Sequence, residues 1–212
     1  MKKIASKYKY YWKRHGFRYA VFSGIVFLAA SLTINHFAGL YANLKAGNYV
    51  NDILLDNLPV MDVDGLLNYG VELFFLFLMY CVIVEPKRAP FALKSIALFY
   101  LVRSISITLT HLGPYPTVTP IDPSNLLATL ISGNDFFFSA HTGIPFLIAL
   151  IFWDEKLIRY ISIMASIVFG SAVILGHLHY SIDVFAAFFI TYTIFHISMK
   201  IFSKEYKLFK EE

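Results

Sequence analysis

Long apolar runs separated by short polar segments make up most of this chain of 212 residues. A membrane-spanning helix needs about 20 mostly apolar residues, and six segments approach or reach that length. The third is the weakest of them, because Lys94 and Arg103 interrupt it. The six segments lie near residues 18–40, 65–84, 90–110, 135–153, 157–176 and 182–202. The pattern predicts an all-α fold, namely an integral membrane bundle of six transmembrane helices.

Lysine and arginine gather in alternate connections of this predicted bundle. They occur before the first span, between the second and third, between the fourth and fifth, and after the last. The other connections contain only one lysine, Lys45, and several aspartates, among them Asp52, Asp56, Asp122 and Asp135. Since connections rich in Lys and Arg stay on the cytoplasmic side, this segregation predicts that both termini are cytoplasmic.

The composition agrees with a membrane protein. Charged residues make up 15% of the chain, against about 25% in a typical soluble domain. The net charge of +4 is explained by basic residues that face the anionic inner leaflet. We therefore expect membrane lipids as partners and no nucleic acid, and a homo-oligomer is compatible with the sequence. Cys81, the one cysteine, cannot form an intrachain disulfide.

Three regions follow from this pattern. Residues 1–17 are basic and aromatic, which is typical of a helix lying at the membrane interface, although a solvated basic tail would explain the same residues. Residues 18–202 form the six-span domain. Residues 203–212 form a basic C-terminal tail.

Ionisable residues inside the predicted spans indicate a functional role, because burying them in a membrane is costly. Arg103, His141, His179, Asp183 and Glu72 all fall toward the outer ends of their spans. Their similar depth predicts that one cavity on the outer side collects them.

His179 and Asp183 stand four residues apart, so on a helix they would share one face. A carboxylate that accepts from one ring nitrogen fixes the tautomer and makes the other nitrogen more basic. This arrangement suits a nucleophile or general base with an orienting partner. The alternative interpretation is a helix N-cap next to an interfacial histidine.

A second histidine and an arginine complete a set suited to phosphoryl transfer. His179 or His141 would attack phosphorus, the other would protonate the leaving oxygen, and Arg103 would stabilise the phosphoryl oxygens. Three further residues near this set are candidates for substrate binding: Ser139, Glu72 and His111.

Metal binding is a weaker interpretation of the same region. His177, His179 and Asp183 include types that bind zinc, but alternating histidines at a helix start point in different directions. The sequence also contains no HExxH motif. We expect neither a metal nor another cofactor.

Three segments resemble conserved segments of the sphingomyelin synthases, a branch of the lipid phosphate phosphatase (PAP2) superfamily. "NDFFFSAHTGIPF" resembles their Ser-Gly-His-Thr segment, and "HLHYSIDVFAAFFITY" resembles their His-Tyr-x-Ile-Asp-Val segment. "YLVRSISITLTHLGPYP" resembles their Tyr-Arg-x-Ile-Thr segment. The resemblance covers roughly residues 98–196 and matches in order and spacing.

The resemblance implies a six-span enzyme without a metal that acts on phosphorylated lipid headgroups at the outer leaflet. His179 would be the nucleophile, Asp183 its partner, His141 the acid and base, and Arg103 a phosphate ligand. Ala140 replaces the glycine usual before the first histidine of the motif.

The function predicted is transfer of a phospho-headgroup from a phospholipid to a lipid alcohol such as ceramide or diacylglycerol, through a phosphohistidine. The alternative is a hydrolase of the same superfamily in which water is the acceptor. A third possibility, a non-catalytic protein on the same scaffold, is disfavoured because His141, His179 and Asp183 are all present. We expect a multi-pass protein of a bacterial plasma membrane with its site facing outward.

Overall fold

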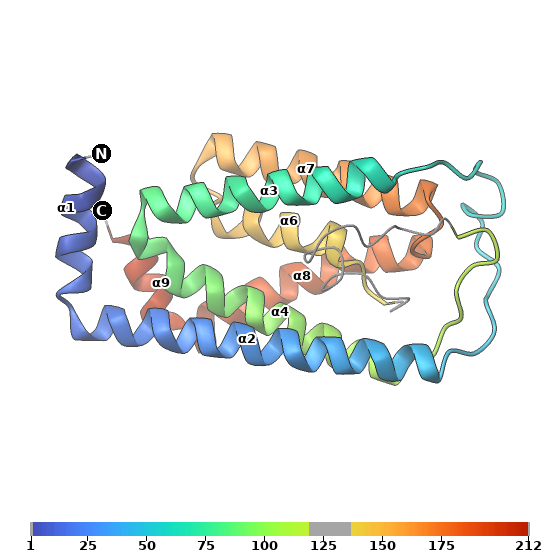
Figure 1. The fold of residues 1–212 in the computed structure, drawn as a ribbon, viewed down its shortest axis with the longest axis horizontal. Coiled ribbons are helices and arrows are strands. Elements are labelled where there is room, and N and C mark those ends of the chain that lie inside the picture. Colours follow the sequence, from blue (N-terminus) through green and yellow to red (C-terminus); the bar gives the residue numbers. More distant parts are fainter. Residues whose placement is uncertain (1, 119–136, 212) are drawn as a thin grey trace.

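The computed structural model describes residues 2–118 and 137–211, and within these ranges every regular element is a helix (Figure 1). Residues 2–88 contain α1 (Lys2–Trp12), α2 (His15–Leu44), α3 (Asp64–Val84) and the short 3-10 helix η1 (Pro86–Arg88). The elements that follow are α4 (Ala89–Leu109), α6 (Ala140–Ile151), α7 (Lys156–Leu175), α8 (Ser181–Ile201) and α9 (Ser203–Lys210). Asp122, Asp135 and the start of the predicted fourth span lie outside the described residues.

Five helical segments are long and apolar enough to cross a membrane: α2, α3, η1 with α4, α7 and α8. Each coincides with a predicted span to within a few residues. The predicted helix over 135–153 is shorter than expected, because α6 has only 12 residues. It begins at Ala140, where the Ser139 hydroxyl oxygen accepts a hydrogen bond from the Thr142 N–H at 3.4 Å. The sixth span therefore stays a prediction.

Large apolar side chains cover the outward-facing sides of these helices. Phe22 on α2 is 67% exposed, Leu73 on α3 70% and Phe189 on α8 62%. Exposing such a surface to water would be unfavourable. The surface and the five long helices together support a multi-pass membrane protein.

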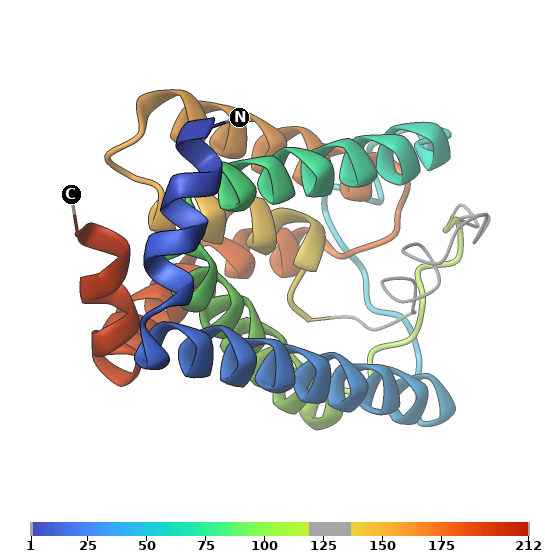
Figure 2. The same ribbon diagram turned by 60° about the vertical axis from the view of Figure 1, so that its left-hand side comes forward.

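The helix α6 runs through the centre of the bundle, beside α7 and α8 (Figures 1 and 2). Leu147, Ile148 and Ala149 are completely buried, as expected for a helix that is apolar on all sides. At Gly143 a Cβ atom would lie 2.6 Å from the Phe99 ring and 2.9 Å from Thr191 Oγ1. The absence of a side chain there lets α6 pack directly against α4 and α8.

Ion pairs join four segments that contain Lys or Arg at one end of the bundle, which we call the basic end (residues 2–14, 85–88, 152–159 and 203–211). Both termini lie there (Figure 1). The pairs that link different segments are Lys7–Glu85, Arg88–Glu155, Lys210–Asp154, and Arg14–Glu211 at 2.9 Å. The four segments predicted to share one side of the membrane thus meet at one end of the fold.

Two connecting segments meet at the opposite end. The loop between α2 and α3 contacts the segment after α4, where the Gly47 N–H donates to the His111 carbonyl at 2.9 Å. The same loop contacts the end of α7, where the Met61 N–H donates to the Leu175 carbonyl at 2.8 Å. These bonds fix the loop over the ends of the helices that hold the site described next.

Candidate functional site

His141 lies in the first turn of α6, directly after the Ser139 cap. Its side chain is half-buried, and its ring faces that of His179, with the two centroids 6.3 Å apart and the planes at 65°. No described residue hydrogen-bonds to the buried Nδ1 of His141. The structure therefore brings the two predicted catalytic histidines together.

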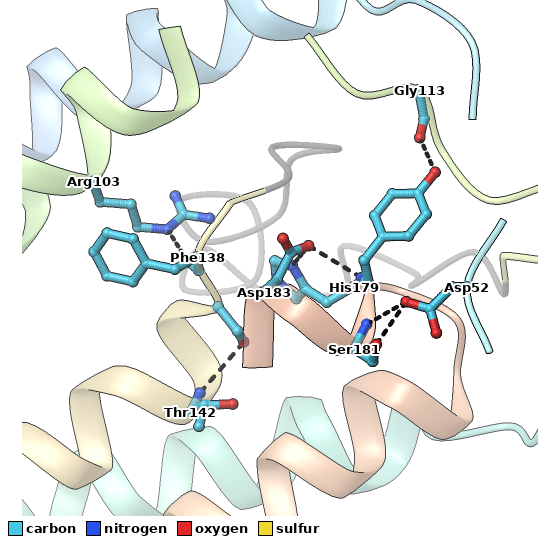
Figure 3. Close-up of polar contacts among 10 residues, drawn as sticks. Asp52, Arg103, Gly113, Phe138, Thr142, His179, Ser181 and Asp183 are labelled. Atoms are coloured by element: carbon cyan, nitrogen blue, oxygen red, sulfur yellow. Dashed lines mark hydrogen bonds and ion pairs between the residues drawn. The ribbon is translucent and has the colours of Figure 1, made fainter. Parts of the chain in front are cut away.

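His179 also contacts Asp183, as the spacing predicted, but not through a shared helical face. The helix α8 begins only at Ser181, so His179 precedes it. The Asp183 carboxylate lies in the first turn of α8 and reaches back over the start of the helix. Its Oδ2 accepts from the Tyr180 N–H at 3.1 Å and lies 3.3 Å from His179 Nδ1 (Figure 3).

This contact determines the tautomer of His179. An ionised carboxylate can only accept hydrogen bonds, so Nδ1 carries the proton and Nε2 keeps its lone pair. His179 is 6% exposed and Asp183 is completely buried. Asp183 also takes part in capping α8, because its carboxylate accepts from the N–H of Tyr180, the N-cap residue.

A backbone hydrogen bond fixes the two helix starts to each other. The Ser139 N–H donates to the Asp183 carbonyl at 3.2 Å. The bond joins the residue that caps α6 to the residue that orients His179. The spacing between the two imidazole rings is therefore set by the backbone.

Arg103 approaches the site from α4 and is 3% exposed. Its Nε donates to the Phe138 carbonyl at 3.0 Å (Figure 3). One terminal nitrogen donates to Asn35 Oδ1 on α2 at 3.3 Å. These bonds place the guanidinium beside the segment that leads into Ser139 and His141.

Asn35 was not among the residues singled out from the sequence. It is a buried polar residue within the first span, and that unusual position is the signal that could have identified it. Its partner could not be identified in this way, because 68 residues separate Asn35 from Arg103.

The structure does not bring all the predicted binding residues into this cluster. Glu72 is exposed on α3. Because α3 has apolar residues on all sides, its sequence did not indicate which side would face the bundle interior. His111 is exposed beyond α4, with its ring against Tyr41 at the end of α2. Ser139 lies in the cluster, but its hydroxyl oxygen caps α6.

Of the three residues considered for a metal site, His177 does not join His179 and Asp183. His177 turns away from Asp183, and its Nδ1 lies 2.5 Å from Thr117 Oγ1. Within residues 2–118 and 137–211, no group of three or more His, Cys, Asp or Glu side chains is arranged to hold a metal ion.

An apolar cavity of about 190 Å³ ends at His141. Its walls come from α2, α3, α4, α6 and α7, and include Leu32, Phe74 and Ile144. Tyr100 and His141 are the only polar side chains of the described lining. The candidate site thus combines a buried group of ionisable residues with an adjoining space suited to hydrocarbon.

Residues 132–200 match the family described as PAP2 superfamily C-terminal. The matched range contains His141, His179 and Asp183, together with α6, α7 and most of α8. No curated protein and no solved structure matches the chain.

The site and the family match point to the same class of protein. The described helices, five of them long and apolar enough to cross a membrane, hold a histidine pair and a carboxylate in the range that matches. The match supports membership of the PAP2 superfamily, whose members are phosphatases and phosphotransferases.

The buried carboxylate gives a first test of the site. Asp183→Asn keeps an acceptor for the Tyr180 N–H but removes the charge that orients His179 and stabilises its positive form. We expect phosphatase or phosphotransferase activity to fall about 10²- to 10⁴-fold, with little change in thermal unfolding. The matched control is Asp64→Asn, since Asp64 occupies the first turn of α3, away from the histidines. An Asp183→Asn variant as active as the parent would contradict the assignment.

Proposed function

We propose that this protein is a membrane-embedded phosphotransferase that moves the phosphorylated headgroup of a phospholipid to a lipid alcohol of the ceramide or diacylglycerol type. The observation that carries the proposal is the pair of facing imidazole rings, one oriented by a buried carboxylate, at the end of an apolar cavity. The resemblance to the sphingomyelin synthases supports the same reaction.

In the first half-reaction, Nε2 of His179 attacks phosphorus. The bond between phosphorus and the diacylglycerol oxygen breaks, and His141 donates a proton to that oxygen. Diacylglycerol leaves, and the headgroup phosphate stays bound to His179. The Asp183 carboxylate stabilises the positive charge that develops on the His179 ring.

In the second half-reaction, His141 accepts the proton of the acceptor hydroxyl. The acceptor oxygen then attacks phosphorus, and the bond to Nε2 of His179 breaks. The new phospholipid leaves, and both histidines return to their starting states. Proton transfer in both directions by one residue needs His141 close to His179, as the 6.3 Å separation of the ring centroids provides.

Arg103 is proposed to bind the phosphoryl oxygens. Guanidinium groups hold phosphate through forked pairs of hydrogen bonds. The bonds to Phe138 and Asn35 would hold the group in place before substrate arrives, so little ordering is needed on binding.

The cavity favours a lipid acceptor over water. Its walls are almost entirely apolar, and water gains few hydrogen bonds in such a space. A hydrocarbon chain gains dispersion contacts there and loses no hydrogen bonds. We therefore place part of the lipid substrate between α2 and α3, next to His141.

The orientation in the membrane is part of the proposal. The four basic segments at the basic end favour a cytoplasmic location for both termini. The histidine pair then lies on the outer side of the bundle, in what we propose is a bacterial plasma membrane.

A headgroup-transfer assay tests the reaction. Purified protein in lipid nanodiscs receives phosphatidylcholine labelled in the headgroup, with and without ceramide or diacylglycerol. We expect label in a new lipid only when an acceptor is present, and none with His179→Ala. His196→Ala, a change within α8 at a residue whose ring packs against Tyr192, should retain activity. Release of free phosphocholine or phosphate instead would show a hydrolase. The absence of turnover by the parent protein would contradict both reactions.

A substitution in the cavity tests where the lipid binds. Leu32→Trp fills space next to His141, so turnover of a long-chain phospholipid should fall about tenfold or more. A short-chain, water-soluble phospholipid needs less of the cavity, and its turnover should change less than about twofold. Leu40→Trp, an exposed residue of the same helix, is the control. Equal losses for both substrates would place the hydrocarbon chain elsewhere.

A further inference from the structure

Asp52 is a buried carboxylate far along the chain from the catalytic candidates. It lies in the loop between α2 and α3 and is 7% exposed. Its Oδ1 accepts from the N–H groups of Leu54 at 2.9 Å and Leu55 at 3.3 Å. Its Oδ2 accepts from both the N–H of Ser181, at 2.7 Å, and the Ser181 hydroxyl, at 2.8 Å. One carboxylate thus joins the loop to the start of α8.

Ser181 is the first residue of α8. The first N–H groups of a helix have no partner within it, and a negative charge is favoured at this end of a helix. Asp52 supplies both an acceptor and a charge. Figure 3 shows its carboxylate bound to Ser181 directly beside the His179–Asp183 pair.

The position of Ser181 matters because it lies between the two residues of that pair. His179 precedes it by two residues and Asp183 follows it by two. The contact between them, at 3.3 Å, depends on the path of the chain where α8 begins. A shift of Ser181 would move both partners.

A second contact holds the same part of the loop against the residue before Ser181. The Tyr180 hydroxyl accepts from the Val50 N–H at 3.3 Å and donates to the Gly113 carbonyl at 2.8 Å. Gly113 lies so close to the loop that a Cβ atom would be 2.3 Å from the Gly47 carbonyl oxygen. The backbone near Asp52 is therefore anchored on both sides.

Asp52 is ionised at neutral pH. Burial raises the pKa of its carboxyl group, but the hydrogen bonds from Ser181, Leu54 and Leu55 lower it, and the net pKa lies below its ordinary value. The charge that acts on the start of α8 is thus a permanent feature of the folded protein near pH 7.

We propose that Asp52 is a positioning residue of the enzyme, which holds the start of α8 so that Asp183 orients His179. Asp52 does not touch the substrate and acts through Ser181. The inference rests on the proposed function, because it assigns Asp52 a part in catalysis by the histidine pair.

Kinetics of four variants test the inference. Asp52→Ala should lower kcat about 10- to 100-fold and change KM less than about threefold, because misplacing a catalytic group slows the chemical step. Ser181→Ala should have a smaller effect of the same kind. The double variant should be no slower than Asp52→Ala, since both changes break one connection.

The matched control is Asp62→Ala. Asp62 lies in the same loop, is exposed, and accepts from the Asp64 N–H at the start of α3 at 3.1 Å. It thus bonds to the first residue of a helix that carries none of His141, His179 and Asp183, and its removal should change kcat less than about twofold. Equal losses in Asp52→Ala and Asp62→Ala, or an effect on KM alone, would overturn the inference.

A measurement without substrate separates this inference from the proposed function. Histidine-selective ¹⁵N NMR of the full-length protein reports the tautomer of His179 and the environment of its Nδ1. We expect Asp52→Ala, but not Asp62→Ala, to change the His179 signals. If the parent protein shows no turnover, the proposed function fails while this result still decides the role of Asp52. Unchanged His179 signals in Asp52→Ala would contradict that role.

If Asp52→Ala does not fold, Asp52→Asn provides the test. Asparagine keeps the size and an acceptor oxygen but loses the charge, so kcat should fall about 3- to 10-fold. Full activity and parent-like His179 signals in this variant would overturn the inference.

Discussion

The contact between His179 and Asp183 is the interaction on which the rest of the site depends. Asp183 is completely buried, and an unpaired charge in such a place costs several kcal/mol. The fold offsets this cost with the Tyr180 N–H and with His179 Nδ1. Because the bond to Nδ1 fixes the tautomer, the lone pair stays on Nε2, the nitrogen that attacks phosphorus in the proposed mechanism.

The elements around this contact act on it through the backbone. Ser139 joins the start of α6 to Asp183, and so sets the distance to His141. Asp52 joins the loop between α2 and α3 to the residue between His179 and Asp183. The ion pairs between basic segments are at the other end of the bundle. The basic residues that would determine the orientation in the membrane thus lie at the opposite end of the bundle from the ionisable residues proposed for catalysis.

Much of this arrangement could be predicted from the sequence, because it depends on local patterns. Apolar runs predicted the five helices that are long and apolar enough to span a membrane. The spacing of His179 and Asp183 predicted their contact, although His179 precedes α8 and does not share a helical face with Asp183. The late start of α6 was not predicted. The apolar residues Phe137 and Phe138 extend the apolar run to the N-terminal side of Ser139, the residue that caps the start of α6.

The remaining features depend on contacts between distant parts of the chain. Asp52 meets Ser181 across 129 residues, and nothing in the local sequence of the loop distinguishes it from Asp56 or Asp62. Glu72 lies at the predicted depth along α3, but on the exposed side of the helix and not toward the histidine pair. The depth of a residue follows from its position along the predicted span, whereas the side on which it lies depends on how the helix packs. The rotation of a helix that is apolar on all sides cannot be predicted from its own sequence.

The proposed mechanism requires a covalent bond between phosphorus and His179. The decisive experiment mixes the protein with labelled phosphatidylcholine, quenches the reaction rapidly and locates the acid-sensitive phosphohistidine adduct by mass spectrometry. We expect the headgroup phosphate on the peptide that contains His179, and no adduct in His179→Ala. An adduct on His141, or turnover without any adduct on His179, would contradict the mechanism.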